Sequence, residues 1–171
     1  MNLDTAQDKF IQTWSSLGSQ WGINKTMAQI HAFLLISSDA MSAEDIMTKL
    51  SISRGNVNMN VRELINWQLV RKEYKSGERK EYFIATKDIY EVAQHIIRER
   101  KKRELDPIKR IIEELQFVEG ETSEELEEFR KVVGDINDLN KKADGLLNMI
   151  LKSDQNWFTK SFIKFFTGFT K

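Results

Sequence analysis

The chain has 171 residues, of which 40% are hydrophobic and 30% charged, with one proline and no cysteine. This composition can form a core, and it excludes disulfides, thiolate nucleophiles and cysteine-bound zinc. Residues 1–8 are polar, unlike a signal peptide, and no apolar stretch approaches the roughly 20 residues that span a bilayer, so we expect a cytoplasmic protein without a membrane partner.

The charges are separated along the chain although the formal net charge is zero. Residues 53–103 hold 13 Lys and Arg against 7 Asp and Glu, a balance of +6, whereas residues 104–144 hold 6 against 13, a balance of −7. Sequence-independent affinity for DNA comes from neutralising phosphates. Only the basic middle of the chain is therefore expected to face DNA.

Two helices are predicted at the start of the chain. Residues 3–17 have apolar side chains near helical spacing, and Gly18 is expected to end this helix. Residues 24–38 are apolar over much of the helix circumference, which predicts a buried central helix.

Two short capped helices are predicted next. Ser42 and Asp45 have the spacing of a capping box, which would open a helix that ends at Leu50. After a tight two-residue turn, Ser53 is expected to cap a helix that runs to about Trp67.

A β-hairpin is predicted directly after these helices. Residues 69–74 and 81–86 are strand-like, and the connector between them contains a glycine. Two short helices, a tight turn and a following hairpin form a winged helix-turn-helix. The expected fold class is therefore mainly α with a small β-hairpin wing, together with long C-terminal dimerisation helices.

Two more helices are predicted before residue 121. Asp88 is expected to cap the first, and Asp106-Pro107 to restart a second that Gly120 stops. The apolar stripe of the first comprises Ile89, Val92, Ala93, Ile96 and Ile97, and the expected buried face of the second comprises Ile108, Ile111, Ile112 and Leu115.

A heptad pattern predicts a long helix after a second capping box at residues 122–125. Asn140 lies inside the seam, where one polar residue can fix register. The seam requires a partner helix, so we expect a homodimer; the alternative is an interaction or scaffold module that uses the 122–152 face. The expected dimerisation residues are Leu126, Phe129, Val133, Ile136, Asn140, Leu147 and Ile150.

The tail at residues 157–169 places several phenylalanines on one face, with lysines nearby. Packing on the dimer core is the favoured interpretation, and a membrane-surface helix is the alternative.

The helix that begins after Ser53 is the expected recognition helix. Its apolar residues cluster on one side, and small or polar residues lie opposite. Asparagine can pair with adenine, arginine with guanine or phosphate, and a wing arginine suits a narrow minor groove. The expected DNA-binding residues are Ser53, Arg54, Gly55, Asn56, Asn58, Met59 and Arg62 on the helix, and Lys75, Arg79 and Lys80 on the wing.

Several motifs in the first ninety residues resemble the GbsR branch of the MarR superfamily. They lie at residues 21–26, 29–30, 52–64, 67–70 and 77–80. The resemblance implies a homodimeric repressor-type regulator with recognition-helix contacts from residues 53–62 and an arginine-bearing wing. It also suggests control of compatible-solute genes through choline or glycine betaine.

An enzyme is not expected, because the only histidines, His31 and His95, stand alone on predicted helices. No cofactor, metal site or catalytic residue is predicted. The aromatic residues suggest two interpretations: core packing, which is favoured, or a cage for a small quaternary ammonium effector formed by Trp14, Trp21, Trp67 and Tyr82.

The expected organisation is a DNA-binding domain at residues 1–90 and a helical dimerisation region at 91–171, with residues 1–20 adding to the dimer interface. Two-fold symmetry would require a palindromic operator in double-stranded DNA, with half-sites about one helical turn apart.

Overall fold

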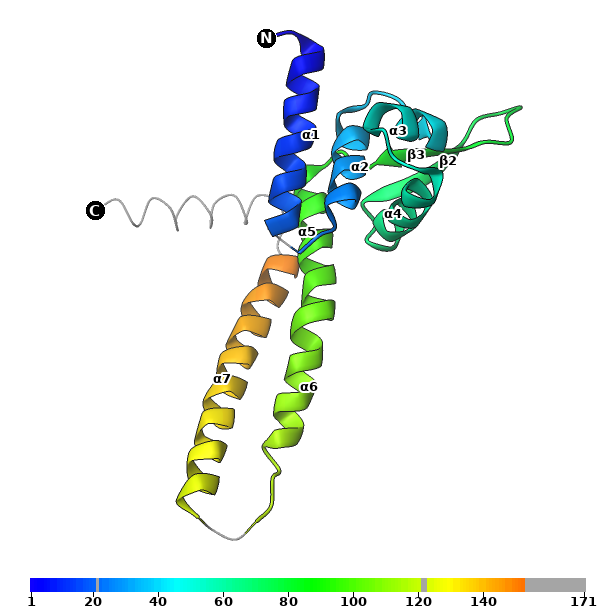
Figure 1. Ribbon diagram of the computed structural model, residues 1–171. Helices are drawn as coiled ribbons and strands as arrows, with labels where there is room; N and C mark the ends of the chain where they lie inside the picture. The colour runs from blue at the N-terminus through cyan, green and yellow to red at the C-terminus, as the bar shows by residue number, and fades with distance from the viewer. Residues whose placement is uncertain (21, 121–122, 153–171) are drawn as a thin grey trace. The chain divides into compact units, whose positions relative to one another are not determined.

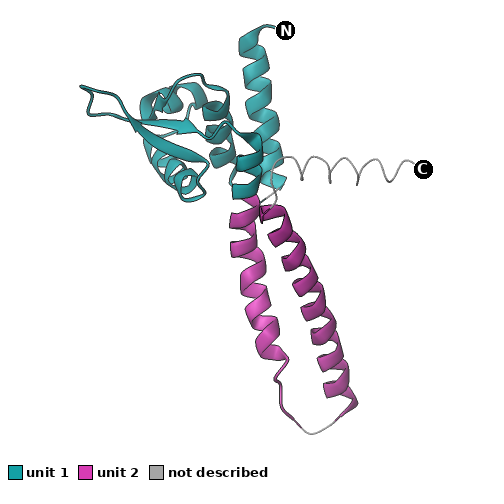
Figure 2. Ribbon diagram, turned by 180° about the vertical axis from the view of Figure 1, so that it is seen from behind, with its two compact units in different colours: residues 1–95 teal, residues 96–171 magenta. Residues whose placement is uncertain are grey.

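The computed structural model describes residues 1–20, 22–120 and 123–152. They form two compact units, residues 1–95 and 96–171, and the boundary falls within helix α5 (Ile89–Arg100) (Figure 2). Among the described residues, no helix combines the length and the apolar character that crossing a bilayer needs. The aromatic tail at 157–169 lies outside the described residues.

Unit 1 is a winged helix-turn-helix (Figure 1). Its elements are α1 (Leu3–Gln20), α2 (Lys25–Ile36), β1 (Met41–Ser42), α3 (Ala43–Leu50), α4 (Arg54–Asn66), β2 (Val70–Tyr74), β3 (Glu81–Ala85) and the start of α5. The predicted fold class, mainly helical with a small wing, is confirmed.

The core of unit 1 forms around α2, which contacts α1, α3, α4 and β3. Ile30 and Leu34 of α2 are fully buried together with Ile46 of α3 and Leu64 of α4. Burial of such apolar side chains supplies the main stabilisation of the unit. The prediction of a buried central helix at 24–38 is confirmed.

The sheet has three antiparallel strands in the order β1-β3-β2. Met41 pairs with Phe83, and Val70 pairs with Ala85. The two-residue strand β1 was not predicted, because two residues carry no detectable alternation. It fixes the start of α3 to the base of the wing.

Gly18 was expected to end the first helix, and this prediction is wrong, because α1 continues to Gln20. A Cβ atom on Gly18 would lie 2.7 Å from the Cβ of Ala28 in α2. Glycine therefore stands here to let α1 and α2 approach closely, and not to stop the helix.

Lys87 joins the end of α2 to the segment that follows β3. Its ammonium group donates to the carbonyl oxygens of Leu34, Leu35 and Ser37 at 2.8, 2.8 and 2.6 Å. These oxygens lie at the negative end of a helix and have no partner within it, so a cation stabilises them. Burial lowers the pKa of Lys87.

Unit 2 contains the rest of α5, the π-helical segment η1 (Lys101–Leu105), α6 (Asp106–Leu115) and α7 (Glu124–Lys152). Helix α6 begins at Asp106 with Pro107 in its first turn, as predicted. The chain does not leave the helical conformation before it, because the backbone stays helical from α5 through η1 into α6. The helix also ends at Leu115, before the predicted stop at Gly120. Asp88 caps α5 as expected, because its carboxylate accepts the amides of Tyr90 and Glu91.

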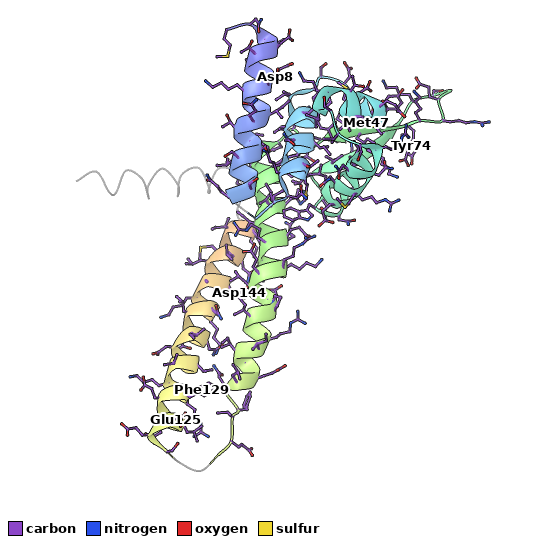
Figure 3. The ribbon with its side chains drawn as sticks, viewed as in Figure 1. Asp8, Met47, Tyr74, Glu125, Phe129 and Asp144 are labelled. Atoms are coloured by element: carbon purple, nitrogen blue, oxygen red, sulfur yellow. The ribbon has the colours of Figure 1, made fainter. Side chains whose placement is uncertain are left out.

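Helix α7 packs against η1 and α6 of the same chain. Asp144 lies on the side of α7 that faces these helices (Figure 3), where it contacts Lys101 at 2.8 Å and Lys109 at 3.7 Å. Lys101 also contacts Asp106 at 3.0 Å. The hairpin of helices is therefore joined by a charged network, which sequence periodicity does not reveal.

The prediction of a buried face on α6 does not hold within the single chain, because Ile108, Ile111 and Leu115 are exposed. Ile89 of the α5 stripe is exposed as well. Periodicity identifies an apolar face, but it does not say whether the same chain covers it.

Candidate nucleic-acid interface

A tight turn between α3 and α4 sets the direction of the predicted recognition helix. Ser51 adopts the left-handed conformation at φ 53°, and Ser53 then caps α4 by accepting the amide of Asn56 at 3.3 Å. The predicted capping box of α3 is also present, with Ser42 and Asp45 exchanging hydrogen bonds. These local bonds fix where both helices begin.

Helix α4 has two distinct faces. Val57, Val61 and Leu64 are at most 2% exposed and pack into the core. The opposite face is open to solvent. All the helix residues named as DNA contacts lie there: Ser53, Arg54, Gly55, Asn56, Asn58, Met59 and Arg62.

Two polar residues of α4 depart from the expected pattern. Asn60 is buried, and its amide donates to the Asn56 carbonyl at 2.8 Å, so it belongs to the helix and not to the outer surface. Glu63, expected on the outer face, is half-buried and accepts from the Trp67 indole at 3.1 Å. Both side chains therefore form hydrogen bonds within the protein at the edges of the outer face.

The wing is the hairpin of β2 and β3, which extends away from the helices of unit 1 (Figure 1). Gly77 turns the connector at φ 82°, a conformation that suits glycine. Lys75, Arg79 and Lys80 are all exposed on it. Lys75 also lies over the ring of Tyr82, with its nitrogen 4.2 Å from the ring centre, a cation-π contact that orients the lysine.

A hollow of about 360 Å³ lies between the starts of α3 and α4 and the wing. It brings together three of the predicted helix and wing cations with one predicted asparagine and two carboxylates. Its lining residues include Arg54, Asn58, Arg79, Lys80, Glu44 and Glu81. A surface of this kind can hold anionic groups through the cations, and it carries donors and acceptors for base edges.

Carboxylates among the predicted contacts are the feature that the sequence analysis missed. Glu44 forms an ion pair with Arg54, Glu81 contacts Lys72 at 2.6 Å, and Glu78 accepts from the Tyr82 hydroxyl. Glu81 and Lys72 are diagonal neighbours across the hairpin, because Lys72 pairs with Phe83 and Tyr74 pairs with Glu81. The Glu44 pair joins two helices, and no local spacing predicts it.

The aromatic residues proposed as an effector cage sit on separate elements with separate partners. Trp14 donates to His31 at 3.2 Å, Trp67 donates to Glu63, and Tyr82 donates to Glu78. Trp21 lies outside the described residues. The contacts seen for these side chains are those of packing and hydrogen bonding within unit 1.

The predicted dimer seam does not lie on one open face of α7. Val133 is buried within the chain, a correction, because α7 already packs on η1 and α6. Phe129 and Ile136 are exposed, whereas Leu126, Asn140, Leu147 and Ile150 are half-buried. The apolar side chains exposed on α7 are Phe129, Val132, Ile136, Leu139, Leu146 and Met149.

Buried polar groups also occur in α7. Asn137 is 3% exposed, and neither its Oδ1 nor the Nδ2 of Asn140 has a partner within the described residues. In the described ranges, no group of three or more histidine or carboxylate side chains is arranged to share a metal ion.

Comparison with known proteins finds a similar bacterial regulator. It is 23% identical over 114 residues to the HTH-type transcriptional repressor GbsR of Bacillus subtilis strain 168, a match that covers 67% of this chain and 63% of GbsR. The chain thus spans less than two thirds of the length of that relative. The resemblance to the GbsR branch is confirmed by this match, although no protein-family model matches the sequence.

One solved structure shares the fold. A crystal structure described as a transcriptional regulator aligns with a TM-score of 0.56 and 18% identity, covering 84% of this chain and 99% of the other. A mutant of S. aureus MepR bound to an oligodeoxyribonucleotide aligns over 84% of this chain and 92% of its own length, with a TM-score of 0.40 and 15% identity.

Proposed function

We propose that this winged helix-turn-helix chain, similar in sequence to GbsR, is a DNA-binding transcription regulator of the repressor type. One observation carries the proposal: the outer face of α4 presents small, polar and basic side chains beside a wing that bears Arg79 and two lysines. Residues 54–81 hold 7 Lys and Arg against 4 Asp and Glu, so this segment is locally basic.

Each outer residue has a role in this account. Gly55 and the N-terminus of α4 approach the phosphate backbone, where the helix dipole favours an anion. Asn56, Asn58 and Arg62 read base edges in the major groove, and Arg79 enters the minor groove. Lys75 and Lys80 contact phosphates, and Met59 offers an apolar contact to a thymine methyl group.

A gel-shift with the DNA upstream of the protein's own gene, at two salt concentrations, tests the proposal. The wild-type chain should bind, and its affinity should fall steeply with salt. Arg62→Ala should lose about 1–3 kcal/mol of specific affinity if Arg62 reads a base. An affinity that does not depend on salt concentration, or no binding, would point instead to an interaction module that uses the 122–152 face.

We also propose that the chain acts as a homodimer through unit 2, with residues 1–90 as the DNA-binding domain and residues 1–20 adding to the dimer interface. Support comes from apolar side chains that unit 2 leaves exposed on both α6 and α7, among them Ile111 at 56% and Leu139 at 67%. Single apolar residues on a surface are ordinary, but rows along two helices mark interaction sites.

Light scattering coupled to size-exclusion chromatography tests whether the chain is a homodimer. The wild-type mass should be twice 20.0 kDa, and Leu139→Lys with Leu146→Lys should shift it towards one chain. Lys142→Glu, a change at another exposed position of α7, serves as the control. A wild-type monomer at micromolar concentration would refute the dimer. A dimer would require a palindromic operator with half-sites about one turn apart.

Effector control is the finer part of the proposal. GbsR is named as a repressor, and the sequence resemblance suggests choline or glycine betaine as ligands. A ligand that binds better to a DNA-incompetent state would release the operator. Titration of the tryptophan fluorescence with both compounds tests this step. An unchanged spectrum together with unchanged DNA affinity would remove effector control and leave DNA binding standing.

A further inference from the structure

Glu44 is a carboxylate of α3 that lies among the proposed DNA contacts. We infer that Glu44 limits the sequence-independent affinity for DNA: it occupies Arg54, and a backbone phosphate must displace it before Arg54 can bind the duplex. The inference rests on the proposed function. Glu44 would thereby lower the affinity for DNA of any sequence.

The geometry supports a direct competition for Arg54. Arg54 is the first residue of α4, and its Nη2 donates to Oε1 of Glu44 in the first turn of α3. Both side chains line the hollow that Asn58 and Lys80 also line. A phosphate drawn to the N-terminus of α4 would approach this same guanidinium.

Glu44 remains charged at neutral pH. A hydrogen bond from its own backbone amide, the hydrogen bond from Arg54 and the nearby charges of Arg54 and Lys80 hold the pKa of Glu44 below its ordinary value of 4.5. A neutral carboxyl group would not compete with phosphate for a guanidinium, whereas a carboxylate does.

The pair is weak enough to exchange. The side chains of Arg54 and Glu44 are 61% and 44% exposed, so solvent screens their attraction. Exposed ion pairs of this kind contribute little to stability. Glu44 therefore does not block the site. It removes part of the affinity that one free arginine would add, and its charge repels the phosphate once Arg54 has been released.

A positioning role for Glu44 would have the opposite consequence. If the carboxylate held Arg54 in the orientation that binds DNA, its removal would weaken binding. The single hydrogen bond between the two side chains favours competition, because it restrains a long and exposed arginine only at one end.

The test compares Glu44→Gln with Glu128→Gln by fluorescence anisotropy on a labelled duplex of mixed sequence. Both variants lose one negative charge, and Glu128 is an exposed residue of α7 whose lysine contact is long, at 4.0 Å. Glu44→Gln should bind about two- to fivefold more tightly at low salt, the range that a freed exposed pair implies. Because Arg54 reaches the phosphate in both proteins, the slope of log affinity against log salt should change by less than the value of about 0.9 that one added phosphate contact would give.

The same change in an Arg54→Gln protein tests whether the effect depends on the ion pair between Glu44 and Arg54. In Arg54→Gln, the further change Glu44→Gln should have a much smaller effect than in the wild type, and thermal unfolding should show that every variant is folded. Glu44→Gln binding no better than Glu128→Gln, or binding less tightly, would overturn the inference while leaving the proposed function intact. No salt-dependent binding by the wild type would overturn both.

Discussion

His31 makes the stability of the protein depend on pH. It is 3% exposed within α2, and its Nδ1 accepts the indole N–H of Trp14 at 3.2 Å. This contact requires a neutral ring with its proton on Nε2, which has no partner within the described residues. Burial, and then the charge of Lys87, lower the pKa of His31 from 6.5 to about 4.

The sign and the size of the effect follow from this difference. Between pH 6.5 and 4 the unfolded chain binds a proton at His31 that the folded chain does not bind. The free energy of unfolding therefore falls as the pH falls. A difference of one pKa unit corresponds to about 1.4 kcal/mol, so the loss is about 2 kcal/mol at pH 5 and about 3 kcal/mol at pH 4.

Urea unfolding monitored by circular dichroism between pH 7 and pH 4 measures this loss. The control is His31→Gln, which retains an acceptor for Trp14 but does not titrate. Carboxylates with lowered pKa values, such as Glu44, whose ordinary value is 4.5, also lose stabilisation as the pH approaches 4, but they do so in both proteins and cancel in the comparison. The wild type should lose about 3 kcal/mol more than the variant over this range. Equal losses in both proteins would refute the account of His31 as a buried neutral base.

Three further changes test the packing and capping of unit 1. Gly18→Ala should lower the free energy of unfolding by about 1 kcal/mol, because its methyl group would lie 2.7 Å from the Cβ of Ala28. Gly55→Ala is the control: no neighbour lies closer than 4.0 Å, so the free energy of unfolding should not fall. Lys87→Met should cost about 1–2 kcal/mol, since it removes three hydrogen bonds from a charged donor at a partly exposed site. Ser53→Ala should cost about 1 kcal/mol through loss of the α4 cap. Urea unfolding at pH 7 measures all of them, and a stabilised Gly18→Ala or an unchanged Lys87→Met or Ser53→Ala would contradict the contact concerned.

The helix-turn-helix could be predicted from the sequence because short-range chemistry determines it. The caps at Ser42 and Ser53 act over three residues, and the two faces of α4 follow from a 3.6-residue period. The hairpin likewise follows from two strand-like runs around Gly77. Such signals lie within a dozen residues of the feature that they determine.

The features that could not be predicted depend on contacts between distant segments. Gly18 is a typical helix stop in isolation, and only the close approach of α2 shows that it serves packing instead. The heptad seam of α7 identified apolar positions correctly, yet Val133 faces its own chain while Leu139 faces solvent. Sequence period gives the spacing of an apolar face, and the arrangement of helices decides which part of it is covered.

The carboxylates near the proposed DNA contacts illustrate the same limit. Glu44 begins α3 and is typical of a first helical turn, where an acidic residue stabilises the dipole. Its ion pair with Arg54 joins residues ten positions apart across the turn. A count of local charge therefore overstates the number of cations that are free to meet phosphate.

The dependence of DNA affinity on salt tests most sharply whether the chain binds DNA through α4 and the wing. It should be recorded for the wild type, for Arg79→Ala on the wing and for Lys131→Ala on α7, using the duplex from upstream of the gene. The account predicts a linear fall of log affinity with log salt, a slope lower by about 0.9 for Arg79→Ala and an unchanged slope for Lys131→Ala. One common slope for all three proteins, or no salt dependence at all, would contradict it.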